Sequence, residues 1–200
     1  MTNETLIKDL KGAAAIARAA DNAPLLGGPI GLMWGVLLTL VLGLQYALLE
    51  QIIAAPLWWI AVLWIGFGVV GGAGSAILGR RIDQKPGVNS VGNRVETAVW
   101  VMFGATIATA FVAAMLSMVF GFQDQTAWGL IVVVAFMGQG LAYGTTARIH
   151  PSRLVAFSSV ACLVAGSAAL IMHDTTAVYL IGAIGSFFAI VVPTLLSGRG

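Results

Sequence analysis

The sequence predicts an all-α integral membrane protein, a bundle of six transmembrane helices. Its 200 residues are 59% hydrophobic and only 9% charged, and the mean hydropathy is +0.96. Soluble domains carry about 25% charged residues, so we expect most of this chain to lie in lipid. Six long runs without a charged residue, and basic residues confined to alternate connections, support the same conclusion.

Each charge-free run is long enough to cross the hydrocarbon core of a bilayer, which needs about 20 apolar residues. Backbone amides in lipid must be hydrogen-bonded within their own segment, so continuous apolar runs predict helices. The connections on one side are short, so consecutive spans should pair as three antiparallel hairpins. The expected spans are 29–49, 56–78, 97–121, 127–147, 154–172 and 176–196.

Residues 1–24 form a cytoplasmic segment before the first span, and a short amphipathic helix is predicted over 5–20, ended by 21–24. Leu6 and Leu10 share one face, while Lys8, Lys11 and Arg18 gather on another. Such a helix can lie on anionic lipid or dock a partner, and its alanines suit packing beneath the protein's own loops equally well. The rest of the chain, 25–200, is expected to be one six-span domain that keeps its first span as an anchor.

The basic residues predict the orientation. All 10 Lys and Arg residues lie outside the spans, in the N-terminal segment, the second connection, the fourth connection and the C-terminus. The remaining connections contain Glu50, Asp124 and Asp174 and no base. Lys and Arg mark cytoplasmic loops, so we expect both termini inside, in a bacterial cytoplasmic (inner) membrane. A net charge of +2 could suggest a nucleic acid partner. Because the basic residues lie just outside the spans, we expect them to face the surface of the lipid bilayer, and we predict no nucleic acid partner.

Small residues recur every four positions within several spans, which lets helix backbones approach closely. On the second span, Gly68, Gly72 and Ala76 form one stripe, and Gly71 and Ser75 belong to the neighbouring stripe. We expect the Gly68 stripe to pack against another helix of the bundle, with contacts in a homo-oligomer as the alternative.

The connection between the second and third spans holds the densest polar sequence. In a purely structural interpretation, its arginines anchor the second span at the headgroups, and Asn93 caps the third span in a capping box with Glu96. That interpretation does not explain the amides and serine of the loop, so we also consider a role in binding a cytoplasmic protein partner or an anionic lipid headgroup. The candidate contact residues are Arg80, Arg81, Lys85, Asn89, Ser90, Asn93 and Arg94.

Motifs for catalysis are absent: the sequence has no HExxH, GxSxG or Walker loop. We therefore predict no catalytic residue, no metal site and no cofactor. The spans also have no ionisable group near their midpoints, where ion-coupled carriers usually place one. Gln139 and Tyr143 are the notable polar residues, one helical turn apart, and are candidates either to line a narrow polar path or to hydrogen-bond two helices together.

These observations favour a non-enzymatic regulator, sensor or assembly partner that acts through the loop at 80–94. A small permease or channel is the alternative, on the evidence of the glycine-rich spans. A membrane enzyme acting on lipid is a second alternative. A continuous polar cavity that reaches the middle of the membrane would favour the permease over the regulator.

Overall fold

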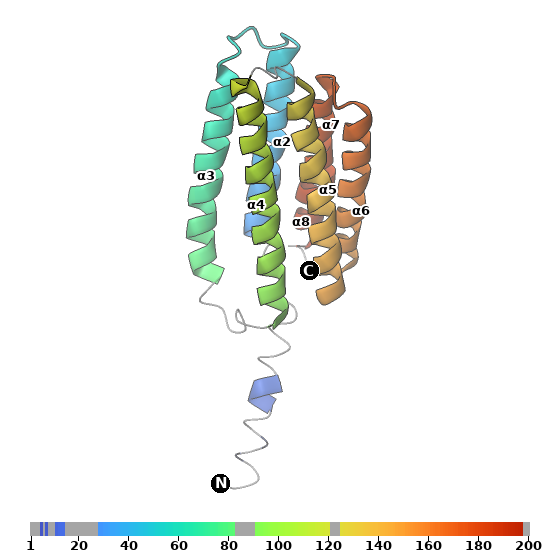
Figure 1. Ribbon diagram of the computed structural model, residues 1–200. Coiled ribbons are helices and arrows are strands. Elements are labelled where there is room, and N and C mark those ends of the chain that lie inside the picture. The colour runs from blue at the N-terminus through green and yellow to red at the C-terminus, as the bar shows by residue number, and fades with distance from the viewer. Residues whose placement is uncertain are drawn as a thin grey trace.

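Six helices long and apolar enough to cross a membrane make up the computed structural model (Figure 1), which confirms the predicted all-α six-helix bundle. The described residues are 28–82, 91–120 and 125–197, with Thr5, Ile7 and 11–14 near the N-terminus. The spans are α2 (Pro29–Leu49), α3 (Trp59–Ile82), α4 (Val91–Val119), α5 (Gln125–Ile149), α6 (Arg153–Ile171) and a sixth made of α7 (Ala177–Ser186), η1 (Phe187–Val191) and α8 (Val192–Ser197).

The described residues near the N-terminus are helical. Most of the predicted amphipathic segment lies outside the described residues, so its role stays a prediction. The chain enters the first span at Gly28, whose φ of 122° suits glycine, and Pro29 then occupies the first helical position, where its missing N–H costs nothing.

Several helices extend beyond the predicted spans at the end of the bundle where the arginines lie, α3 and α4 by the most. α3 continues through Arg80 and Arg81, and α4 begins before Arg94. Charge-free runs underestimate these helices because long basic side chains can reach the headgroups from a helical backbone. Asn93 therefore lies in the first turn of α4, and the expected N-cap position for Asn93 is wrong.

The two ends of the bundle differ in charge. Exposed arginines occur where α3 ends, α4 begins and α5 connects to α6, and we call this the basic end; it holds Arg80, Arg81, Arg94, Arg148 and Arg153. At the opposite, acidic end, the carboxylate of Glu50 accepts a short hydrogen bond from the hydroxyl of Thr176. That bond joins the end of α2 to the start of α7.

The most extensive helix contact joins α5 and α6. Gly140 of α5 lies so close to α6 that an added Cβ would be 2.7 Å from Leu163. The Ser159 hydroxyl donates a hydrogen bond of 2.7 Å to the Gly140 carbonyl. Close backbone approach and a hydroxyl bridge are how helices associate in lipid, where no hydrophobic drive acts between them.

The core of the bundle lies where α7 packs against α2, α5 and α6. Phe136 of α5 is completely buried, and an added Cβ at Gly185 would lie 3.1 Å from its ring and 2.8 Å from Ala165. The sixth span also contains a π-helical turn, η1, just before Pro193. Proline cannot donate to the carbonyl four residues back, and the π turn accommodates this gap in the hydrogen-bond ladder.

α3 is attached to α2 by two hydrogen bonds between side chains. The indole of Trp34 donates to Ser75 at 2.9 Å, and the indole of Trp64 donates to the Gln45 carbonyl oxygen at 2.8 Å. Gly71 lies directly beneath the Trp34 ring and leaves no room there for a Cβ atom. The neighbouring stripe of small residues, not the predicted one, therefore faces the bundle.

The predicted packing of the Gly68 stripe within the bundle is wrong. Gly68 and Gly72 have no heavy atom within 4 Å of an added Cβ, and Ala76 is exposed. A period of four residues marks both stripes equally, so it could not show which one meets α2. Contact with a second copy of the chain stays an untested alternative.

α3 and α4 are the least buried helices. Only 6% of the residues in the apolar window of each are buried, against 39% in α5. α3 packs on α2 and α4 packs on α5, and within the described residues α3 and α4 share no substantial interface. Figure 1 shows both helices on the same side of the bundle, away from α6.

Candidate functional site

A cavity of about 570 Å³ lies inside the bundle between two walls. α2 and α3 form one wall, α4 and α5 form the other, and Tyr179 of α7 with Ile190 of η1 closes the back. The neighbouring helices around this ring touch one another except at α3 and α4. We call the side of the cavity between α3 and α4 its opening, because these two helices share no substantial interface.

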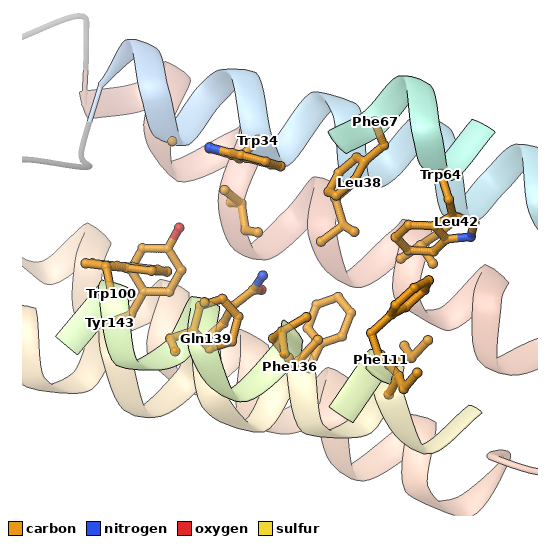
Figure 2. A pocket seen from close by; sticks show the side chains of 18 of the residues that line it. Trp34, Leu38, Leu42, Trp64, Phe67, Trp100, Phe111, Phe136, Gln139 and Tyr143 are labelled. Carbon is orange, nitrogen blue, oxygen red and sulfur yellow. The ribbon is translucent and has the colours of Figure 1, made fainter. Parts of the chain in front are cut away.

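The lining of the cavity is mostly aromatic and aliphatic (Figure 2). Several rings pack edge to face, which fixes their orientation. The ring centroids of Trp34 and Phe67 are 5.1 Å apart on one wall, and those of Trp100 and Tyr143 are 5.0 Å apart on the other. The aromatic lining residues are Trp34, Trp64, Phe67, Trp100, Phe103, Phe111, Trp128, Phe136, Tyr143 and Tyr179.

Polar groups occur at two places along the cavity. Near the acidic end, the Gln45 side-chain carbonyl oxygen accepts the hydrogen bond from Trp64, and Tyr179 lines the cavity nearby. Towards the basic end, Gln139 and Tyr143 extend from α5 into the space between the walls.

The two polar residues singled out in the fourth predicted span therefore line the same cavity. The Gln139 carbonyl oxygen accepts a weak hydrogen bond from the Cys162 thiol, with sulfur and oxygen 3.9 Å apart. This contact also joins α5 to α6. The cavity beside Gln139 is lined mostly by aromatic and aliphatic side chains.

A second group of polar side chains is buried where α4 begins against the end of α5. Asn93, Glu96, Thr146 and His150 are all buried, Glu96 with only 1% exposure. An added Cβ at Gly92 would lie 3.2 Å from the His150 ring nitrogen Nε2. Gly92 thus allows the start of α4 to approach α5 closely, beside the basic end of the cavity.

The proposed contact residues of the 80–94 loop fall into three groups: exposed, buried and outside the described residues. Arg80, Arg81 and Arg94 are exposed at the basic end. Asn93 is buried, at 4% exposure. The remaining candidates, Lys85, Asn89 and Ser90, lie outside the described residues. The structure therefore brings together exposed guanidinium groups at the ends of α3 and α4, next to the opening between these helices.

Sequence reasoning did not find the cavity itself. Trp34, Trp64, Trp100 and Trp128 each lie within three turns of a helix end, where tryptophan is expected at the membrane interface. The interface rule therefore does not predict that all four tryptophans line the cavity inside the bundle. A usable signal was present in Trp34 and Trp64, because an indole N–H beyond the first turn of a span needs a polar partner.

No family model matches the chain, and neither the curated proteins nor the solved structures contain a match. Among the described residues, no three His, Cys, Asp or Glu side chains come together to hold a metal ion. The features that bear on function are therefore the cavity and the charged ends of the two helices beside it.

Proposed function

We propose that this protein is a non-enzymatic regulator, sensor or assembly partner that binds a hydrophobic molecule taken from the bilayer between α3 and α4. The observation that carries the proposal is the aromatic cavity of about 570 Å³ in a bundle whose α3 and α4 share no substantial interface. Ligand pockets typically measure about 300–1,000 Å³ and are lined mainly by apolar and aromatic side chains.

The chemistry of the lining favours a hydrophobic ligand over a hydrated solute. A permease for ions or polar solutes would need charged or hydrated groups along its path. The cavity offers indole and phenyl rings instead, and none of the described residues that line it is charged. An apolar molecule in the cavity would gain dispersion contacts with these rings, which an empty cavity lacks.

The basic end supplies a second candidate contact. We keep the hypothesis that the loop at 80–94 faces the cytoplasm and holds a protein partner or an anionic headgroup. The exposed side chains of Arg80, Arg81 and Arg94 favour it, because juxtamembrane basic clusters attract anionic surfaces. Both helices that flank the opening of the cavity end in this loop, so a ligand that moves α3 or α4 would also move the contact surface.

A pair of glycine substitutions tests the cavity. Gly104 of α4 lines the cavity and Gly72 of α3 does not, and neither has any atom within 4 Å of an added Cβ. Gly104→Phe should fill the cavity, whereas Gly72→Phe adds the same ring to the outer surface. In native mass spectrometry from mild detergent, we expect a bound lipid on the wild type and on Gly72→Phe, and loss of that lipid from Gly104→Phe. An undiminished lipid adduct on Gly104→Phe would rule out the cavity as the binding site.

A further inference from the structure

The end of the cavity nearest the arginines presents hydrogen-bond donors. The Gln139 carbonyl oxygen already accepts from Cys162, so its NH₂ group is the part of the amide left for a ligand. The Tyr143 hydroxyl lies one helical turn further along α5. Figure 2 shows both groups directed from the α4–α5 wall towards the α2–α3 wall.

These donors have no acceptor within the described part of the chain. No hydrogen bond from the Gln139 NH₂ group or from the Tyr143 hydroxyl occurs there, and the buried indole N–H of Trp100, whose ring packs on Tyr143, also has no acceptor. An unmade hydrogen bond in an apolar setting costs about 1–3 kcal/mol. The acidic end of the cavity differs, because its polar groups pair with one another.

The electrostatics at this end of the cavity disfavour a ligand with an anionic head group. The described residues that line the cavity include no Lys, Arg or His. Glu96, a buried carboxyl group, lies one helical turn before Trp100 in α4. A phosphate placed here would lose its hydration without gaining a basic partner, which is strongly unfavourable.

Building on the function proposed above, we infer that the cavity binds a lipid whose uncharged head carries carbonyl oxygens. The Gln139 NH₂ group and the Tyr143 hydroxyl donate to these oxygens, the Trp100 ring flanks the head, and the apolar remainder fills the aromatic part of the cavity towards Trp64 and Phe111. Two kinds of bilayer molecule share this head chemistry, a quinone with a hydrophobic tail and a diacylglycerol.

Tryptophan fluorescence of the purified full chain in detergent can test this inference. Four tryptophans line the cavity, Trp34, Trp64, Trp100 and Trp128, and a bound quinone quenches indole emission. Titration with a decyl-substituted benzoquinone measures its affinity. Three competitors then distinguish recognition of the head group from binding of the apolar tail. Dioctanoylglycerol has neutral carbonyls, decylbenzene has no hydrogen-bond acceptor, and decyl phosphate has an anionic head.

The inference predicts that the wild type binds the quinone at concentrations at least tenfold lower than either decylbenzene or decyl phosphate. Displacement by dioctanoylglycerol at similarly low concentrations would extend the binding to diacylglycerols. If only the quinone binds in this way, with dioctanoylglycerol as weak as decylbenzene, the ring carbonyls are the ligand and the inference still holds. More effective displacement by decyl phosphate than by both neutral carbonyl compounds would overturn it.

The matched variant combines Gln139→Met with Tyr143→Phe, which removes both donors and keeps the side-chain volumes close. Loss of two hydrogen bonds should weaken quinone binding by roughly tenfold or more and leave displacement by decylbenzene unchanged. Tyr143→Phe alone, the milder substitution, should weaken binding in the same direction. Unchanged quinone affinity in both variants would overturn the inference.

Gly104→Phe separates this inference from the proposed function. If it abolishes quenching while the donor variants bind normally, the cavity takes hydrophobic molecules without recognising their heads, and only the inference fails. If it leaves quenching unchanged, the ligand lies outside the cavity, and the proposed function fails as well.

Discussion

At the scale of single residues, glycine determines which surfaces of this bundle meet. Gly71 and Gly72 are neighbours in α3, yet one lies under the Trp34 ring and the other faces open space. Helix geometry separates consecutive residues by about 100°, so the two positions are a sensitive pair for testing how α3 docks. The same side chain should have opposite consequences at the two sites.

We expect Gly71→Ala to destabilise the protein, because its Cβ would displace the Trp34 ring and break the indole hydrogen bond to Ser75. Overpacking typically costs about 1–3 kcal/mol. Gly72→Ala should leave stability unchanged or raise it slightly, since alanine is the better helix former. Thermal unfolding in detergent measures both. Equal melting temperatures for the two variants would contradict the placement of α3.

At the scale of elements, the sequence was sufficient for the number, type and order of the spans but not for their ends or facing sides. Hydropathy reports that a segment lies in lipid, and it does so for every span. Hydropathy does not predict the last turn of α3, which continues beyond the apolar run and contains Arg80 and Arg81. Nor does it show which side of α3 meets α2, because lipid-facing and helix-facing surfaces are equally apolar in a membrane protein.

The docking of α3 on α2 depends on its two side-chain hydrogen bonds, and the bond between Trp64 and Gln45 can be measured by a double-mutant cycle. Trp64→Phe and Gln45→Leu each remove one partner, and the double variant removes both. We expect a coupling free energy of about 0.6 kcal/mol and at most about 1.7 kcal/mol, the range for hydrogen bonds between membrane helices. Reversible unfolding in detergent supplies the free energies. A coupling of zero would mean that the hydrogen bond of 2.8 Å does not stabilise the pair of helices.

At the scale of the whole molecule, the candidate site arises from an arrangement that no single span encodes. Its walls combine residues from α2, α3, α4 and α5, with Tyr179 and Ile190 behind them. Sequence reasoning identified Gln139 and Tyr143 because an amide and a phenol stand out in apolar spans. The aromatic residues did not stand out, since they are as compatible with lipid as with a cavity, and the lack of a substantial interface between α3 and α4 is a property of the assembled bundle.

The orientation in the membrane is the remaining prediction at this scale, and the charged ends of the bundle make it testable. Exposed arginines occupy the basic end, whereas the exposed Asp174 lies between α6 and α7 at the acidic end. Retention of basic loops in the cytoplasm predicts that the basic end lies inside.

In a Cys162→Ala background, which removes the single native thiol, Asp174→Cys should react with an impermeant maleimide in intact cells. Pro151→Cys, exposed at the basic end, should react only after the cells are permeabilised, and it changes no charge. The reverse pattern would place both termini outside, and labelling of both variants in intact cells would indicate that the chain inserts in two orientations.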